Sequence, residues 1–216
     1  GTTVTSPGKG TTATAANTTK TSRSTTRQTT AGRPTGTISS AATRPTSTPA
    51  PTPAPTGKEL VGYYPSWAAS SGLPVDKIQA DKLTQINYAF AKIDSGTLKI
   101  AMAYPTTDRR NFEQLRKLKA KYPHLKTMIS VGGWDFSGYF SDAAATAKSR
   151  EAFARSCVEF ILEHGFDGVD LDWEYPVSGG PAGNINSRED KRNFTLLLSA
   201  IRNQLNAQTQ RDGKKY

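Results

Sequence analysis

Apolar residues are distributed unevenly along the 216-residue chain, and their distribution divides it into two parts. The first 57 residues contain no aromatic residue, no Leu and no acidic residue, and their only large aliphatic residues are Val4 and Ile38. Thr, Ser, Pro and Gly fill 39 of these 57 positions. Such a segment cannot bury enough apolar surface to offset the entropy that ordering would cost. We therefore predict a disordered Thr/Ser/Pro-rich linker over 1–57 and a folded domain over 58–216.

Strand-like and helix-like apolar patterns alternate along the predicted domain. Short apolar runs rich in aromatic and β-branched residues predict strands, and apolar residues spaced three and four apart predict helices. The strands are predicted at 60–67, 85–93, 126–134 and 167–174, and the helices at 108–122, 149–164 and 187–206. Residues 214–216 are expected to begin a fifth strand. This alternation is typical of an α/β fold built from parallel β/α units.

Charge and cysteine content exclude several kinds of function. The chain has a formal net charge of +10. However, the Lys and Arg residues among the first 57 positions are spaced singly between Thr residues, and no aromatic side chains accompany them to stack on nucleic-acid bases. We expect no nucleic-acid partner. No apolar run is long enough to span a membrane, and no glycine-rich nucleotide-binding motif follows the first strand. Cys157 is the only cysteine, which rules out an internal disulfide, and its place in a helical apolar stripe predicts a core residue.

The fourth predicted strand carries three carboxylates on one face. Because side chains alternate along a strand, Asp170, Asp172 and Glu174 share a face, and apolar residues occupy the other. Strands in β/α proteins are covered on both faces, so these neighbouring acids should be buried. Burial and mutual repulsion disfavour ionisation, and at least one of the acids should therefore have a raised pKa. The row suits either a divalent metal site or general acid catalysis. It contains no His and lies along one strand, so we expect an acid catalyst and no metal. A solvated edge strand is the structural alternative.

Residues from the other predicted strands supply the surroundings of this acid row. Ser130, Gly132 and Trp134 are expected to share one face, and Gly132 with Gly133 leaves room for the close approach of a ligand. Trp134 offers a flat apolar plate that suits a sugar ring. Three more aromatic residues lie near the C-terminal ends of the first two strands, where β/α proteins place their active sites: Tyr63, Tyr88 and Phe90. Core packing is the alternative for each of them taken singly.

These motifs resemble those of glycoside hydrolase family 18, the chitinases. The segment 167–174 matches the family's D-x-x-D-x-D-x-E signature, and residues 130–133 match its S-x-G-G motif. The G-Y-Y at 62–64, the I-N-Y-A-F at 86–90 and the W-E-Y-P at 173–176 are similar to bacterial secreted chitinases. The resemblance covers about 58–216 and identifies this segment as the N-terminal half of a family 18 catalytic domain.

The resemblance implies a (β/α)8 TIM barrel, of which about the first four β/α units are present, acting on β-1,4-linked N-acetylglucosamine. It implies that Glu174 protonates the glycosidic oxygen, that Asp172 orients the 2-acetamido group of the substrate, and that Asp170 shares a proton with Asp172. The acetamido oxygen would attack the anomeric carbon, which gives retention without a protein nucleophile. Structural support is implied for Asp167, Ser130, Gly132 and Gly133. Contact with the sugar is implied for Tyr63, Tyr88, Phe90, Trp134 and Tyr175. The resemblance implies neither metal nor cofactor.

Two alternatives to an endo-acting chitinase stay open. One is a lectin-like family member that binds chitin without cleaving it, although such relatives usually lack the acid found here at Glu174. The other is an endo-β-N-acetylglucosaminidase that acts on N-glycans.

The alternating prolines at 50–56 are typical of an extended spacer. We therefore expect a secreted, extracellular monomer with a further module before the linker, whose partner is chitin or a chitooligosaccharide. With about four β/α units and two open sheet edges, the chain alone is expected to be inactive and poorly folded.

Overall fold

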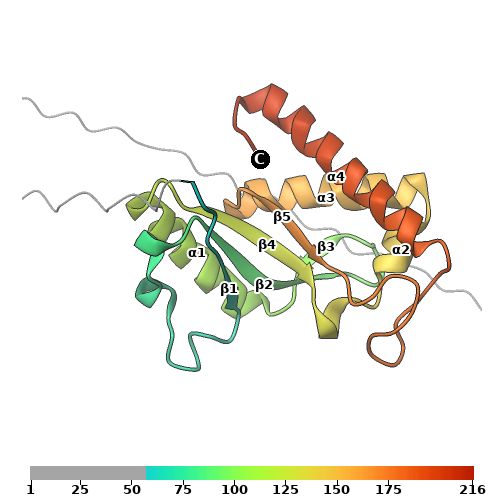
Figure 1. Ribbon diagram of the computed structural model, residues 1–216, viewed down its shortest axis with the longest axis horizontal. Helices are drawn as coiled ribbons and strands as arrows, with labels where there is room; N and C mark the ends of the chain where they lie inside the picture. Colours follow the sequence, from blue (N-terminus) through green and yellow to red (C-terminus); the bar gives the residue numbers. More distant parts are fainter. Residues whose placement is uncertain (1–56) are drawn as a thin grey trace, which may run out of the picture. The chain divides into compact units, whose positions relative to one another are not determined.

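Four parallel strands and one short antiparallel strand form a single sheet (Figure 1). The computed structural model of the protein describes residues 57–216, so the predicted linker lies, apart from Gly57, outside the described residues. The parallel strands β1 (Val61–Pro65), β2 (Gln85–Ile93), β4 (Lys126–Gly132) and β5 (Gly168–Asp172) are arranged in the order β1-β2-β4-β5. All four lie within the predicted strands, and the parallel α/β architecture is confirmed.

The sequence did not predict β3 (Ile100–Met102), which pairs antiparallel with the end of β2. Three residues are too few to show an alternating pattern. The strand forms because the chain turns back after β2 and extends the sheet locally before α1 begins.

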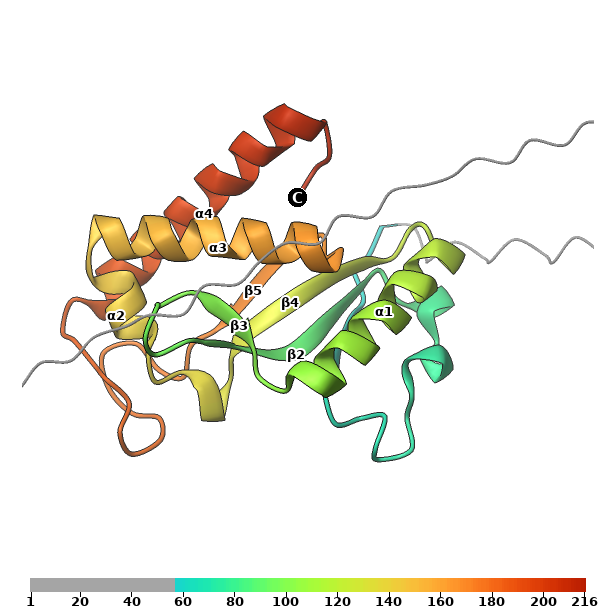
Figure 2. The ribbon, with the colours of Figure 1, turned by 180° about the vertical axis from the view of Figure 1, so that it is seen from behind.

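Three long helices occupy the predicted positions. They are α1 (Pro105–Lys121), α3 (Ala147–His164) and α4 (Asp190–Asp212). Figure 2 shows α1 and α3 across one face of the sheet, whereas no helix of residues 57–216 covers the opposite face in Figure 1. α4 packs against α3 and against the short helix α2 (Phe140–Ala145). The remaining short elements are single-turn 3-10 helices, and we name them η1 (Val75–Lys77), η2 (Ala80–Lys82) and η3 (Trp134–Phe136).

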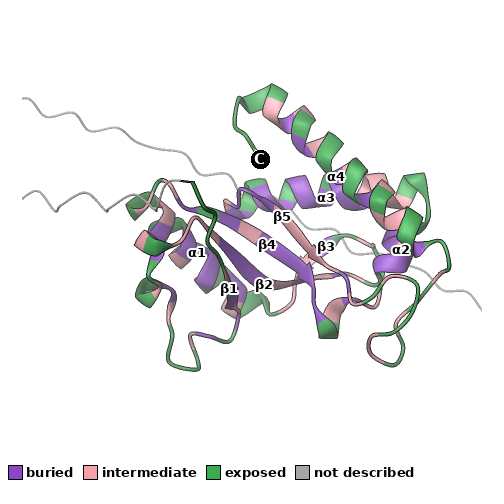
Figure 3. Cartoon of the chain, in the orientation of Figure 1, coloured by how far each residue is buried: buried purple, intermediate pink, exposed green. Residues whose placement is uncertain are grey.

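The hydrophobic core lies between the sheet and the helices α1 and α3. Burial is concentrated along β2 and β4 and on the inner sides of these helices (Figure 3). Core side chains that are essentially inaccessible to solvent include Ile86, Tyr88, Phe112, Leu115, Ile129, Phe153, Cys157 and Ile161. Cys157 is thus the core residue that the sequence predicted, and burial raises the pKa of its thiol. The core fixes β2 and β4 at the centre of the sheet and leaves the other face of the sheet for polar groups.

Residues 214–216 do not form the strand that the sequence predicted. The side chain of Lys214 instead reaches Asp167, with 3.2 Å between Nζ and Oδ1. The Tyr216 hydroxyl donates a 2.7 Å hydrogen bond to Asp212, which holds this segment close to the end of α4. Among the helices of residues 57–216, none combines the length and the apolarity needed to cross a membrane.

Candidate active site

Hydroxyl groups from β1 and β4 converge on one carboxylate of β5. The Tyr63 hydroxyl donates a 2.8 Å hydrogen bond to Oδ2 of Asp170, and the Ser130 hydroxyl donates a 2.7 Å hydrogen bond to the same oxygen. β1 and β5 are separated by two strands, so their axes would lie about 14 Å apart in a flat sheet. Tyr and Asp side chains together cannot span that distance. The contact therefore requires a sheet that curves toward its helix-free face, as in a barrel.

Asp172 lies next to Asp170 on the same face of β5. Burial, and then the negative charge of Asp170, raise the pKa of the Asp172 carboxyl above its ordinary value. The direction is the one expected for a row of neighbouring acids. Burial and the hydrogen bond to Asp170 also raise the pKa of Tyr63, so its hydroxyl remains a donor at neutral pH. The face thus holds two neighbouring carboxylates and two hydroxyl groups that donate to one of them.

Glu174 lies two residues beyond the end of β5, which stops at Asp172 instead of continuing to residue 174 as predicted. The N–H of Gly133 donates a 2.7 Å hydrogen bond to the Asp172 carbonyl oxygen, and the strand stops there because β4 ends at Gly132 and turns away. Trp173 is buried, with its ring stacked 5.2 Å from that of Phe140. The half-buried Glu174 follows it on the segment that leaves the sheet.

A glycine pair makes the turn at the end of β4. Gly132 and Gly133 have φ angles of +107° and +73°, a region that residues with a side chain rarely adopt. A Cβ atom on Gly132 would also collide with the Asp172 carbonyl oxygen, and one on Gly133 would lie 2.8 Å from Cζ of Phe90. The pair therefore lets β4 approach β5 and Phe90 closely and then change direction.

The predicted place of Trp134 on β4 is wrong, because this turn puts the residue at the start of η3. Its side chain is 54% exposed, and those of Tyr63 and Tyr175 are exposed to 56% and 50%. Phe90 is half-buried beside Gly133. These four aromatic side chains are therefore accessible to a ligand to different degrees.

Tyr88 is the one predicted sugar contact that the structure places elsewhere. Its side chain is 0% exposed, and its hydroxyl donates a 2.7 Å hydrogen bond to the buried Asp108 of α1. Asn87, not Tyr88, lies opposite Tyr63 in the register of β1 and β2. Because neighbouring residues of a strand point to opposite faces, Tyr88 points into the core under α1.

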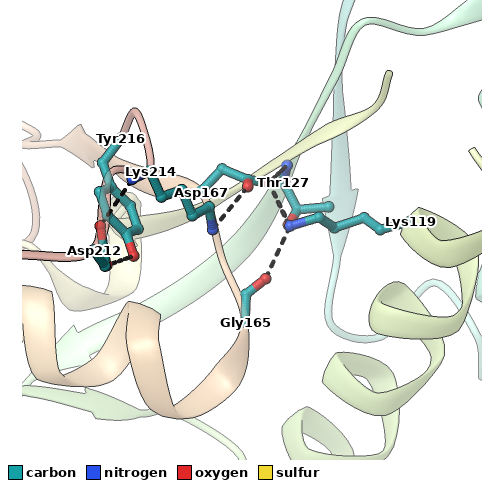
Figure 4. Close-up of polar contacts among 7 residues, drawn as sticks. All are labelled: Lys119, Thr127, Gly165, Asp167, Asp212, Lys214 and Tyr216. Atoms are coloured by element: carbon teal, nitrogen blue, oxygen red, sulfur yellow. Dashed lines mark hydrogen bonds and ion pairs between the residues drawn. The ribbon is translucent and has the colours of Figure 1, made fainter. Parts of the chain in front are cut away.

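Asp167 lies at the other end of β5, far along the strand from Asp172, and Figure 4 shows its contacts. Its Oδ2 atom is 2.5 Å from Nζ of Lys119 and accepts a 2.8 Å hydrogen bond from the N–H of Thr127. Burial alone would raise the pKa of the Asp167 carboxyl, but Lys119, Thr127 and Lys214 outweigh it and lower the pKa. Asp167 thereby links α1, β4 and the start of β5.

No group of three or more His, Cys, Asp or Glu side chains within residues 57–216 has an arrangement that could hold a metal ion. The Asp170 carboxylate instead accepts hydrogen bonds from two hydroxyls, and its charge acts on Asp172.

Comparison with known proteins decides the family. A family model described as glycosyl hydrolases family 18 matches residues 59–216. The chain belongs to this family. Chitinase A1 of Niallia circulans is 44% identical in an alignment that covers 73% of this chain and 29% of the relative. Chitinase C of Streptomyces lividans is 36% identical in an alignment that covers 68% of this chain and 28% of the relative. The chain thus spans less than a third of the length of these relatives.

Solved chitinases share the fold. Chitinase ChiA74 from Bacillus thuringiensis superposes with a TM-score of 0.71 at 38% identity, covering 74% of this chain and 34% of that one. The catalytic domain of the psychrophilic chitinase B from Arthrobacter TAD20 gives 0.66 at 32% identity, covering 73% and 50%. The curved four-stranded parallel sheet is part of a family 18 barrel, and the helix-free face is its interior.

Sequence reasoning missed three residues near the family 18 acid row. Asn87 could have been found from the alternation of side chains along β2, because it lies opposite Tyr63. Ser137 and Asn184 form hydrogen bonds to the backbone of Glu174 at 2.8 and 3.1 Å. No pattern in the sequence marks these two, since both lie in irregular segments far from Glu174 along the chain.

Proposed function

We propose that this protein is a chitinase that hydrolyses β-1,4 N-acetylglucosamine linkages by substrate assistance, with Glu174 as the general acid. The observation that carries the proposal is the group formed by Asp170 and Asp172, with hydroxyls of Tyr63 and Ser130 bound to Asp170. Within residues 57–216, the row combines acids with hydrogen-bond donors, an arrangement that suits general acid catalysis. Membership of family 18 adds support, because several relatives are chitinases.

In the proposed first step, the Glu174 carboxyl donates its proton to the glycosidic oxygen while the bond from that oxygen to the anomeric carbon breaks. The carbonyl oxygen of the 2-acetamido group forms the new bond to the anomeric carbon from the opposite side. The acetamido N–H donates a hydrogen bond to Asp172, which orients the group and balances the charge of the oxazolinium ion.

In the second step, the Glu174 carboxylate takes a proton from a water molecule whose oxygen attacks the anomeric carbon. The oxazolinium ring opens, the configuration is retained, and Glu174 regains its proton. Both hydroxyl donors hold the same oxygen of Asp170, Oδ2. The orientation of Asp170 beside Asp172 is thus fixed, and burial together with the charge of Asp170 raises the pKa of Asp172, which favours the protonated form of Asp172 until the positive charge develops.

The exposed aromatic side chains supply the proposed contacts to the sugar rings. Trp134, Tyr63 and Tyr175 are exposed, the Tyr63 hydroxyl is bonded to Asp170, and Phe90 lies beside Gly133. Aromatic rings bind the apolar faces of sugars and exclude water from them. Tyr88 takes no part in this proposal because it is buried in the core.

The decisive assay compares the full-length protein with its Glu174→Gln variant on a fluorogenic N,N′-diacetylchitobioside. We expect turnover by the wild type and a loss of about 10² to 10⁴ in the variant, because the amide cannot act as a general acid. Binding of chitooligosaccharides should survive in the variant. Binding without turnover by the wild type would point to the lectin-like alternative. Cleavage of a glycoprotein glycan with no turnover of chitooligosaccharides would point to the N-glycan alternative.

We further propose that the protein is secreted and that residues 1–57 connect the catalytic domain to another module. The composition of these residues supports this, since Thr, Ser and Pro are typical of spacers between domains. Detection of the full-length protein in the culture medium tests the secretion. Retention inside the cells would contradict it.

A further inference from the structure

Glu174 lies where the sheet no longer holds the backbone. β5 ends at Asp172, so no strand ladder fixes the peptide groups on either side of Glu174. A general acid must nevertheless be held within fractions of an ångström of its productive position. Some other part of the molecule has to supply this constraint.

The first constraint comes from Ser137, which follows η3. Its Oγ atom accepts a 2.8 Å hydrogen bond from the N–H of Glu174. The same hydroxyl lies 2.8 Å from the carbonyl oxygen of Gly133 and 3.1 Å from that of Asp172, so its single proton can be donated to either. The Ser137 side chain is only 1% exposed. One buried hydroxyl thus joins the ends of β4 and β5 to the peptide N–H of Glu174.

The second constraint comes from Asn184, which holds the other peptide group. Its Nδ2 atom donates a 3.1 Å hydrogen bond to the carbonyl oxygen of Glu174. Gly180, with a φ of +78°, packs so closely that a Cβ atom would collide with that carbonyl oxygen and with Nδ2 of Asn184. The N–H of Ile185 donates to the carbonyl oxygen of Gly138 at 3.3 Å. The segment that carries Asn184 is therefore tied to the one that carries Ser137.

The base of the same segment is also anchored. Asp190, at the start of α4, is fully buried and accepts hydrogen bonds from the backbone N–H groups of Val177 at 3.2 Å and Ser187 at 2.7 Å. It also accepts a 2.7 Å hydrogen bond from the hydroxyl of Ser141 on α2. Both ends of the connection between β5 and α4 are thereby fixed, so the amide of Asn184 is held in place.

We propose that Ser137 and Asn184 are positioning residues for Glu174. Together they fix the peptide N–H and C=O of this residue and so aim its carboxyl at the glycosidic oxygen. The inference rests on the proposed function of Glu174 as the general acid. Neither side chain contacts the reacting atoms in this arrangement. Their loss should therefore weaken proton donation more than it weakens substrate binding.

The dependence of rate on the leaving group separates this role from a purely structural one. A sugar alcohol leaves only when it is protonated, whereas 2,4-dinitrophenolate leaves without protonation. A misplaced general acid therefore slows the cleavage of chitooligosaccharides but largely spares the 2,4-dinitrophenyl glycoside of N,N′-diacetylchitobiose. A loosened fold would slow both reactions together.

The experiment measures kcat and KM of the full-length protein for both substrates, in the wild type and in Ser137→Ala, Asn184→Asp and Glu174→Gln. We expect Ser137→Ala to lower kcat for the chitooligosaccharide by about 10²-fold, the loss typical of a misplacement near 1 Å, with KM little changed. Its kcat for the dinitrophenyl glycoside should stay within about threefold of the wild type. Asn184→Asp keeps the size of the side chain but loses the N–H donor, and it should show the same pattern. Glu174→Gln shows the pattern expected when the general acid itself is lost.

The matched control is Ser156→Ala. Ser156 is a buried serine of α3 whose hydroxyl donates a 2.7 Å hydrogen bond to the carbonyl oxygen of Phe153, in the core and away from Glu174. This variant should leave the ratio of the two rates unchanged. Equal losses on both substrates in Ser137→Ala and Asn184→Asp, or no loss in either variant, would overturn the inference. If Ser137→Ala does not fold, Asn184→Asp decides alone. A wild type that cleaves neither substrate would instead overturn the proposed function.

Discussion

Asp167 and Lys119 form a buried ion pair, with 2.5 Å between Oδ2 and Nζ, at the end of β5 opposite Asp172 (Figure 4). The carboxylate is 5% exposed and the ammonium group belongs to α1, so the pair fastens the start of the acid-bearing strand to the helix layer. Thr127 of β4 donates its N–H to the same oxygen. The first acid of the family signature thus stabilises the strand whose later acids we propose for catalysis.

Asp167→Asn should destabilise the catalytic domain by about 3 kcal/mol, because it leaves the buried ammonium of Lys119 without a counter-charge. The folded state lowers the pKa of Asp167, so this stabilisation is present above the unfolded pKa of about 4 and is lost as the pH falls through the folded value. Urea unfolding followed by tryptophan fluorescence at pH 7 and pH 3 measures both effects. The variant should have a lower free energy of unfolding than the wild type at pH 7, and this difference should be smaller at pH 3. A difference below about 0.5 kcal/mol at pH 7 would rule out a stabilising role.

Tyr63→Phe should lower kcat on chitooligosaccharides by about tenfold or more, because it removes a hydrogen bond to the Asp170 carboxylate. Tyr64→Phe is the matched control, since the neighbouring hydroxyl points to the other face and donates to the carbonyl oxygen of Leu73 at 2.9 Å. Steady-state kinetics of the full-length protein should show the loss only at position 63. Equal activity of the two variants would mean that the Tyr63 hydroxyl does not assist the acid row.

Asp172→Asn should abolish turnover and yet raise the melting temperature at pH 7. The folded state raises the pKa of Asp172, so ionising this carboxyl costs stability as the pH rises from the unfolded pKa through the folded one. The amide carries no charge and avoids this cost. Thermal unfolding at pH 7 and pH 3 should show the gain only at the higher pH. An equal change at both pH values would mean that the charge of Asp172 does not cause it.

Tyr88→Phe should lower stability by about 1–3 kcal/mol and leave KM for chitooligosaccharides unchanged, because it leaves the buried Asp108 without its hydroxyl donor. Trp134→Ala should do the opposite, raising KM with little effect on stability, since that side chain is largely exposed. Denaturant unfolding and steady-state kinetics of both variants make the comparison. A raised KM in Tyr88→Phe with unchanged stability would mean that Tyr88 contacts the sugar after all.

The sequence by itself determined the α/β class, the order of the parallel strands and long helices, and the identity of the acid row. These features are local: helical periodicity, the alternation of side chains along a strand and the spacing of the acids are all fixed within a few residues. The same local logic predicted Cys157 as a core residue. It could not show β3 or α2, which are too short to carry a pattern.

Contacts between distant segments decided the rest. The sequence around Tyr88 does not reveal which face of β2 is covered by α1. Tyr88 is a core residue only because α1 covers the face to which it points. β5 ends where β4 turns away at Gly132 and Gly133, so the end of one strand depends on the path of the other. The constraints on Glu174 come from side chains in two irregular loops. Such features depend on how the sheet curves and how loops pack against it, and a local sequence pattern carries no signal for either.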